Sequence, residues 1–187
     1  FKIDNFDNPV FCNLETKDYV ESNLNKKFDL NHFIKNPKEY KSCALQYLKV
    51  ADVFISAHFW DPASPKIFNQ NDLNKFNNLK VVGDITCDVD GSVPTTIRSS
   101  TIDKPNFYID RNTFKETVGE GLAIMAVDNL PSELPRDSSK EFGDGIVNEV
   151  IPYILNEDDG RVLNATITQN GSFLKKYNYL YDYINTA

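Results

Sequence analysis

Short apolar runs alternate with amphipathic stretches along the first two thirds of the chain. Uninterrupted apolar runs of this length are typical of strands buried in parallel sheets, and they predict strands over residues 53–57, 80–86, 106–109 and 122–127. Apolar residues at helical spacing predict helices over residues 38–50 and 70–77. This order of strands and helices indicates an α/β fold with a parallel sheet.

The predicted elements change after residue 127, from alternating strands and helices to mainly helices. Pro135, followed by an acidic residue, predicts the start of a helix, and the glycines at 143 and 145 predict a break before a second helix over residues 146–155. We expect a strand over residues 161–168, a turn at Asn170-Gly171, and a tyrosine-rich helix over residues 173–184. The chain therefore divides into an α/β part and a mainly helical part.

Polar residues follow three of the predicted strands, in residues 56–60, 84–91 and 128–131. Ligands of open parallel sheets bind beyond the carboxyl ends of the strands, so these stretches form the candidate site. Asp128 comes directly after six apolar residues. We expect it to be partly buried, and a buried carboxylate needs either a partner or a chemical task.

The other candidate side chains each have two interpretations. His58 and Trp60 either form a wall of the site or are ordinary loop residues. Asp84 and Asp88 either contact a ribose or a substrate, or they cap neighbouring backbone amides. The position of these residues in the sequence does not choose between the two.

The charge balance excludes several classes of function. With 27 Asp and Glu against 20 Lys and Arg, the net charge is -7. We therefore expect neither nucleic acid nor an anionic membrane as a partner, because both bind a concentrated basic face. No apolar run approaches the roughly eighteen residues of a transmembrane helix. Three widely spaced cysteines and two histidines predict neither a disulfide framework nor a metal site, and they fit a reducing compartment.

Four stretches of the sequence match the pattern of a known family. They are ADVFISAHFWDPASPKIF at 51–68, VVGDITCDVDGSVPT at 81–95, MAVDNLPSELPRDSSKEFGDGIVNEVIPY at 125–153 and ATITQNGSFLKKYNYL at 165–180. Together they resemble the saccharopine dehydrogenase and lysine–ketoglutarate reductase family of the alanine dehydrogenase and transhydrogenase superfamily. The similarity is strongest to the reductase half of the bifunctional aminoadipic semialdehyde synthases. His58 departs from the pattern, since an aliphatic residue is expected there.

The resemblance implies the C-terminal half of a Rossmann-type parallel sheet, followed by a mainly helical C-terminal segment. Residues 1–127 would form a partial NAD(P)-binding domain without its glycine fingerprint, and residues 128–187 would return to a catalytic domain. The implied cofactor is NAD or NADP. The implied reaction is hydride transfer to or from the imine of lysine and 2-oxoglutarate, which gives saccharopine when it is reduced.

The same resemblance implies roles for individual residues. Asp128 matches a carboxylate beside the acid–base pair of the family, where it would raise the pKa of a His or Lys. The residues that would line the cofactor are Ser56, Ala57, His58, Asp84, Ile85, Thr86, Leu130 and Pro131.

The family's catalytic Lys and His, its substrate-binding arginines and its glycine loop have no counterpart in this sequence. Because the chain starts at Phe1 rather than Met, we expect a part of a longer protein, inactive alone, whose missing N-terminal half is its partner. Self-association stays open. We expect a cytoplasmic protein, or a mitochondrial one in an animal. Two alternative functions remain: an alanine dehydrogenase-like enzyme, and a non-catalytic nucleotide-binding or assembly module.

Overall fold

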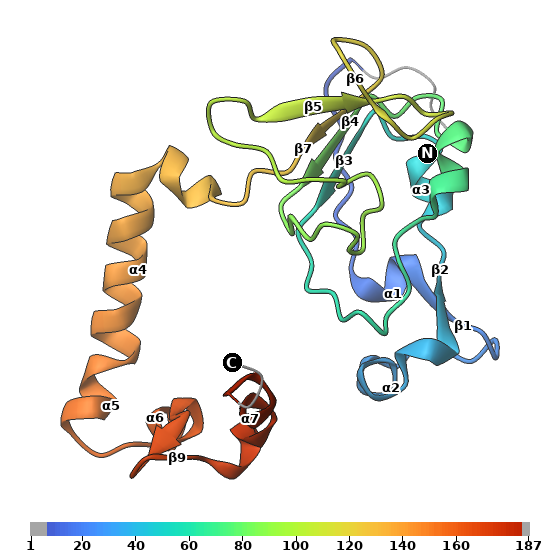
Figure 1. Ribbon diagram of the computed structural model, residues 1–187. Helices are drawn as coiled ribbons and strands as arrows, with labels where there is room; N and C mark the ends of the chain where they lie inside the picture. The colour runs from blue at the N-terminus through green and yellow to red at the C-terminus, as the bar shows by residue number, and fades with distance from the viewer. Residues whose placement is uncertain (1–6, 185–187) are drawn as a thin grey trace. The chain divides into compact units, whose positions relative to one another are not determined.

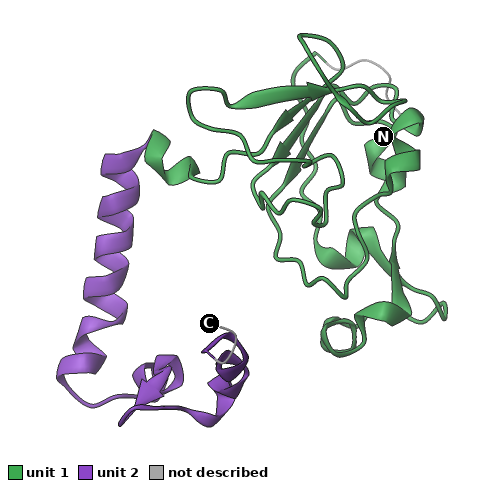
Figure 2. Cartoon of the chain, viewed as in Figure 1, with its two compact units in different colours: residues 1–133 green, residues 134–187 purple. Residues whose placement is uncertain are grey.

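The computed structural model describes residues 7–184, and the chain divides after Glu133 into two compact units (Figures 1 and 2). Unit 1 runs to Glu133 and unit 2 begins at Leu134. The elements of unit 1 are α1 (Thr16–Tyr19), β1 (Val20–Ser22), α2 (Leu30–Lys35), η1 (Pro37–Glu39), β2 (Tyr40–Ser42), α3 (Leu45–Leu48), β3 (Val53–Ser56), η2 (Gln70–Lys75), β4 (Val81–Asp84), β5 (Asn106–Ile109), β6 (Glu116–Thr117), β7 (Leu122–Met125) and η3 (Leu130–Glu133).

A five-stranded sheet in the order β3-β4-β7-β5-β6 forms the centre of unit 1 (Figure 1). The strands β3, β4 and β7 are parallel, whereas β5 pairs antiparallel with both β7 and β6. The expected α/β fold with parallel strands is confirmed, and the sheet as a whole is mixed because β5 is antiparallel to both of its neighbours. The short connection from β5 to β7 holds β6 and no helix, and a parallel return needs a longer crossover.

The core of unit 1 lies on one face of this sheet. Val82, Ile124 and Phe107 occupy neighbouring positions on β4, β7 and β5, and all three are buried. They pack in one cluster with Phe68 and Phe76, whose rings meet edge to face at 5.4 Å. The apolar runs of the sequence therefore form strands, because each strand buries alternate side chains in this core.

The opposite face of the sheet is apolar and open. Val53 and Ile55 of β3 are 54% and 63% exposed, and Val81 of β4 is 36% exposed. Ile55 and Met125 both reach over Gly83, since a Cβ placed there would lie within 3.8 Å of each side chain. Among the described residues, β3 pairs with β4 alone, so its outer edge is also open.

The helix expected over residues 38–50 is wrong. In the structure this stretch holds η1, then β2, then the short helix α3. β2 pairs antiparallel with β1, so that Glu21 lies opposite Lys41 and the two side chains form an ion pair at 3.2 Å. Tyr40 is buried in this two-stranded sheet. Helical periodicity in a short stretch is a weak signal, because short helices are marginal without packing, and the pairing of β2 with β1 overrides it.

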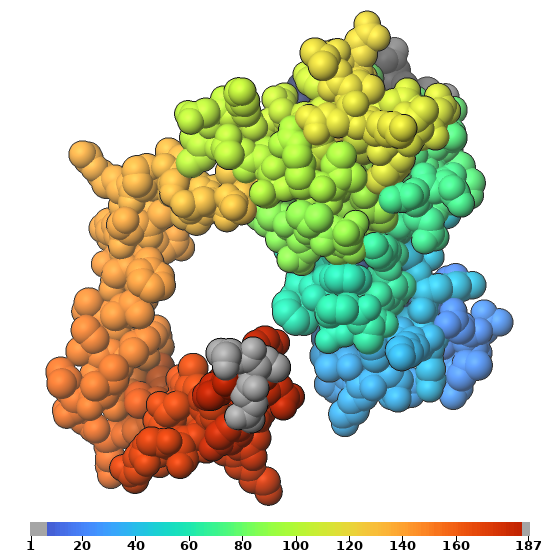
Figure 3. All heavy atoms as spheres, in the orientation of Figure 1, coloured from blue at the N-terminus to red at the C-terminus, as the bar shows by residue number. Residues whose placement is uncertain are grey.

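Unit 2 consists of one long helix, several short helices and one small hairpin. Its elements are α4 (Pro135–Glu149), α5 (Ile151–Leu155), α6 (Arg161–Ala165), β8 (Thr168–Gln169), β9 (Ser172–Phe173), η4 (Lys175–Leu180) and α7 (Tyr181–Ile184). None of its described residues is buried. Figure 3 shows the atoms of this unit as orange and red spheres. In the part of the chain that the structure describes, no helix is long and apolar enough to cross a membrane.

Two expectations for unit 2 are corrected. α4 runs through Gly143 and Gly145 and ends at Glu149, with Val150 as its C-cap, because Pro152 in the next turn cannot continue a helix. The strand expected over residues 161–168 is mostly the helix α6. Its first turn is fixed by the Asp158 carboxylate, which accepts hydrogen bonds from the backbone N–H groups of residues 160, 162 and 163.

Other expectations hold. The helix start at Pro135 and the turn at Asn170-Gly171 are confirmed. The tyrosine-rich segment is helical from Lys175 onward, partly as a 3-10 helix. The strand over residues 106–109 is found with its expected bounds.

Candidate functional site

The three candidate stretches all leave the same edge of the sheet. β3, β4 and β7 run parallel, with Ser56 level with Asp84 and Gly83 level with Met125. The carboxyl ends of β3 and β4 are joined by a hydrogen bond of 2.8 Å from the Ile85 backbone N–H to the Ser56 carbonyl oxygen. The expected convergence of residues 56–60 and 84–91 is therefore present, and it follows from the parallel register.

Asp84 is a fully buried carboxylate at the end of β4. One oxygen accepts hydrogen bonds from the backbone N–H and the hydroxyl of Thr86, at 3.1 and 2.6 Å. The other accepts from the hydroxyl of Thr96 at 2.5 Å. Both oxygens are thus engaged by the protein itself, which offsets the cost of burying the charge. The carboxylate therefore holds the two ends of the loop of residues 86–96 by hydrogen bonds and does not face solvent.

Thr96 and Cys87 are organising residues that the sequence analysis missed. Cys87 lies in the left-handed region of the backbone, with φ of 56°. Its thiol donates to the Val127 carbonyl oxygen at 3.0 Å and to the Asp84 carbonyl oxygen at 3.2 Å, so it joins the ends of β7 and β4. Burial raises the pKa of Cys87, and the nearby carboxylates, Asp84 foremost, raise it further. No local sequence signal marks the contact of Cys87 with Val127 or that of Thr96 with Asp84, because these partners are 40 and 12 residues apart along the chain.

Ser56 and His58 form a second polar pair at the end of β3. The Ser56 hydroxyl is buried and lies 3.2 Å from Nδ1 of His58. The Nε2 atom of His58 is buried and has no hydrogen-bond partner among the described residues. Burial lowers the pKa of His58, while Asp84 and Asp88 oppose the shift. The imidazole is therefore neutral at neutral pH.

The third stretch is arranged differently from expectation. Asp128 is exposed, so its expected partial burial is wrong. β7 ends at Met125, and the next two residues, Ala126 and Val127, are also buried. Val127 forms a parallel β-bridge with Ser100. The Ser100 backbone N–H donates to the Ala126 carbonyl oxygen, and the Ser100 hydroxyl accepts from the Ala126 N–H. Asp128 is the first residue beyond this bridge and turns to solvent.

The remaining candidates differ in exposure. Ala57 and Ile85 are exposed, Thr86 and Leu130 are half-buried, and Pro131 is exposed in η3. Residues 57, 85 and 86 follow β3 and β4 directly, where they flank the two polar pairs. Within residues 7–184 no three His, Cys, Asp or Glu side chains are grouped so that they could hold a metal ion.

A family comparison covers nearly the whole chain. Residues 10–181 match the model of the alanine dehydrogenase/PNT C-terminal domain. The chain belongs to this family. Its relatives include α-aminoadipic semialdehyde synthases and saccharopine dehydrogenases, so the family resemblance found in the sequence is confirmed.

Three curated relatives show how much of a whole protein this chain corresponds to. The α-aminoadipic semialdehyde synthase of Arabidopsis thaliana is 27% identical over 90% of this chain and 17% of its own length. The mitochondrial α-aminoadipic semialdehyde synthase of Rattus norvegicus is 24% identical over 78% of this chain and 20% of its own length. The saccharopine dehydrogenase [NAD(+), L-lysine-forming] of Yarrowia lipolytica is 28% identical over 59% of this chain and 30% of its own length. The chain thus spans less than a third of these proteins.

Proposed function

We propose that this chain is part of an NAD(P)-dependent oxidoreductase of lysine metabolism. The proposed reaction moves a hydride to or from the imine of lysine and 2-oxoglutarate. The observation that carries the proposal is the assembly at the ends of β3 and β4. There the family-like residues 84–88 form an ordered site beside Ser56 and His58. The names of the relatives support the choice of substrates.

The proposed cofactor wall consists of residues after β3 and β4 together with Leu130 and Pro131. Exposed Ala57 and Ile85 and the half-buried Thr86 and His58 offer a mainly apolar surface. Asp84 contributes indirectly, because its carboxylate is fully used in holding Thr86 and Thr96. A surface of this kind suits the nicotinamide and ribose end of a dinucleotide.

The diphosphate of a dinucleotide does not fit this chain. A phosphate-binding glycine loop lies in the turn from a strand into a helix, and none of the eight glycines occupies such a turn. Gly119 and Gly121, with φ of 76° and 121°, connect β6 to β7 instead. In our proposal, the phosphate donors come from another part of the full-length polypeptide.

We propose that this other part covers the open face and edge of the sheet. Val53, Ile55 and Val81 are apolar and exposed, and an open edge strand is a template for further pairing. Unit 2 also lacks a buried residue among those described. In the proposed arrangement it packs on a catalytic domain, where the exposed carboxylate of Asp128 takes part in the acid–base chemistry.

Oxidation of NADPH by the full-length protein tests the proposed reaction. We expect absorbance loss with lysine plus 2-oxoglutarate and none with pyruvate plus ammonia. The reverse result would instead identify an alanine dehydrogenase-like enzyme, and no reaction with either pair would favour a non-catalytic module. This chain alone should be inactive and should not bind NADPH at micromolar concentration. Micromolar binding in a titration would contradict the assignment of the phosphate site to another part of the polypeptide.

A further inference from the structure

The β8–β9 hairpin of unit 2 turns at Asn170 and Gly171. Gln169 pairs with Ser172, so the loop holds only these two residues, whose φ angles are 51° and 77°. Positive φ at both positions is the pattern of a type I′ turn, which favours Asn followed by Gly. This is the only place in the sequence where Gly follows Asn. The turn has no part in the site at the ends of β3 and β4.

The two turn residues are open to solvent and unbonded. Both are exposed. Within the described part of the chain, neither the Asn170 side chain nor the Gly171 backbone N–H has a hydrogen-bond partner. A Cβ added at Gly171 would meet no heavy atom within 4 Å, and glycine itself has no Cβ to hinder its nitrogen. Nothing in the hairpin therefore shields the Asn170 amide or the nitrogen that follows it.

These two residues can react with each other. The Gly171 backbone nitrogen attacks Cγ of Asn170, the new bond closes a succinimide ring, and the side-chain nitrogen leaves as ammonia. Water then opens the ring at either of its carbonyl carbons. One opening leaves an aspartate, and the other leaves an isoaspartate, in which the backbone runs through the former side chain. No electrons are transferred, and water is the only co-reactant.

The reaction requires the hairpin to open. The attack rotates the bond between Cα and the carbonyl carbon of Asn170, and a closed turn holds this rotation fixed. Two residue pairs and a flanking hydrogen bond of 2.9 Å, from the Leu174 backbone N–H to the Ile167 carbonyl oxygen, join the two arms. None of the described residues of unit 2 is buried. A small hairpin without buried contacts is marginally stable, so its local opening costs little free energy.

We propose that Asn170 is a site of spontaneous covalent modification, namely deamidation through a succinimide, and that the folded chain reaches it by opening the β8–β9 hairpin. The product carries one more negative charge than the original chain. This inference goes beyond the proposed function, because no step in it involves a cofactor or a substrate.

The isoaspartate product should disturb the hairpin. It adds a methylene group to the backbone of the turn, so the loop no longer fits between the paired residues Gln169 and Ser172. The next residue of β9, Phe173, packs its ring edge to face against Tyr181 of α7 at 4.8 Å. Loss of the hairpin register therefore also weakens the contact between β9 and α7.

Asn164 provides a comparison within the same unit. It is also exposed, but it lies in α6, where its backbone N–H donates to the Gly160 carbonyl oxygen at 2.8 Å. Its own carbonyl oxygen accepts a hydrogen bond from the Tyr177 hydroxyl at 3.1 Å. The next residue is Ala165, whose Cβ hinders the attacking nitrogen. Asn164 should therefore stay unmodified while Asn170 reacts.

Incubation of this chain at mildly alkaline pH, followed by peptide mass spectrometry, tests the proposal. We expect the mass gain of replacing NH2 by OH in the peptide that holds Asn170, and none in the peptide that holds Asn164. Ion-exchange chromatography of the intact chain should show a matching shift to a more acidic form. Incubation in water enriched in heavy oxygen identifies product formed before the digestion step.

Three variants separate the parts of the proposal. Asn170→Gln should abolish the product, because a Gln side chain closes its larger ring slowly, and Asn164→Gln is the matched control that should keep it. Phe173→Ala removes the ring contact with Tyr181 and should speed the reaction, since the hairpin then opens more often. Circular dichroism checks that each variant is folded.

The unaltered chain decides the matter even if a variant fails to fold. Absence of a mass gain at Asn170, an equally fast gain at Asn164, or a gain at Asn170 that needs denaturant would each overturn the proposal. An unchanged rate in a folded Phe173→Ala variant would overturn the opening of the hairpin as its route. Oxidation of NADPH by the full-length protein is a separate measurement, so failure here leaves the proposed reaction untouched.

Discussion

The hydroxyl of Thr96 donates a 2.5 Å hydrogen bond to the carboxylate of Asp84, and both residues are completely buried. This contact closes the loop of residues 86–96 onto the end of β4. Within that loop, Gly91 makes a turn so tight that an added Cβ would lie 2.4 Å from the Cβ of Asp88. The strand-end site therefore depends on a buried charge that is satisfied by hydroxyl and amide donors.

Replacing Thr96 by valine should destabilise unit 1. The substitution keeps the shape of the side chain but leaves one oxygen of Asp84 without its donor, at a cost of about 1–3 kcal/mol. Chemical denaturation measures the loss in the free energy of unfolding. Thr101→Val is the matched control, because Thr101 is exposed, and it should change this free energy by less than about 0.5 kcal/mol. Equal effects of the two variants would show that the buried contact contributes nothing.

The free energy of unfolding should depend on the protonation of His58. Burial holds the pKa of His58 below its ordinary value of 6.5, so the unfolded chain takes up this proton at a higher pH than the folded chain. The contribution of the neutral imidazole to the free energy of unfolding is fully present above pH 6.5. This contribution decreases as the pH drops below that value.

Denaturation curves at a series of pH values test this dependence. His58→Gln should flatten the fall in stability on the acid side, whereas His32→Gln should retain it. A His58→Gln variant with the same pH profile as the unaltered chain would contradict the assignment to His58. A direct titration of the His58 ring by NMR gives an independent reading of the same pKa.

Cys12 and Cys87 should differ in their rate of alkylation. The thiolate is the reactive form of cysteine. Cys12 is exposed, whereas Cys87 is partly buried, bonded to two carbonyl oxygens, and has a raised pKa. Mass spectrometry of the folded chain after brief treatment with iodoacetamide should find the label on Cys12 first. Denaturation should remove the difference, and preferential labelling of Cys87 in the folded chain would refute the described contacts.

The two faces of the sheet should respond differently to the same substitution. Ile124→Ala removes a fully buried side chain from β7 and should lower the free energy of unfolding by about 2–5 kcal/mol. Ile55→Ala changes a side chain that is 63% exposed on β3, and the loss should stay below about 1 kcal/mol in this chain. In the full-length protein, the Ile55 variant should cost more if the open face is covered as proposed. An equal cost in both proteins would count against that cover.

The sequence alone predicted the four strands β3, β4, β5 and β7, since short apolar runs such as residues 122–127 are typical of strands in a buried sheet. The parallel register of β3 and β4 then follows, and with it the meeting of Ser56 and Asp84. The family resemblance also came from the sequence, because the motif after β4 is contiguous along the chain. The local sequence pattern was enough to predict a contact wherever the two residues are close in sequence or are brought together by the register of the sheet.

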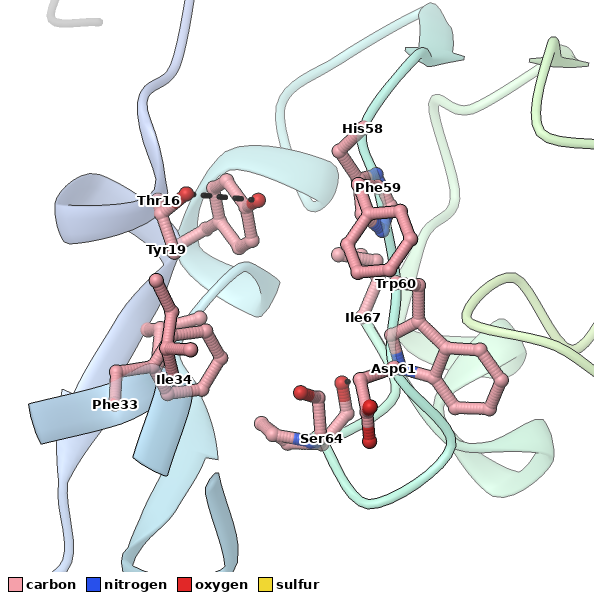
Figure 4. A pocket seen from close by; sticks show the side chains of 12 residues that line it. Thr16, Tyr19, Phe33, Ile34, His58, Phe59, Trp60, Asp61, Ser64 and Ile67 are labelled. Atoms are coloured by element: carbon pink, nitrogen blue, oxygen red, sulfur yellow. Dashed lines mark hydrogen bonds between the residues drawn. The ribbon is translucent and has the colours of Figure 1, made fainter. Parts of the chain in front are cut away.

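Only the tertiary structure decided the remaining features. The exposure of Asp128 depends on Ser100 bridging the end of β7, and the burial of Asp84 depends on Thr96. The two-stranded sheet of β1 and β2 replaced part of an expected helix, because cross-strand pairing outweighed a weak periodicity. A pocket of about 130 Å³ beside His58 is lined by three separate segments, at residues 16–20, 33–34 and 58–67 (Figure 4). Each of these features is a contact between distant residues, and such a contact leaves no periodic trace in the sequence around either partner.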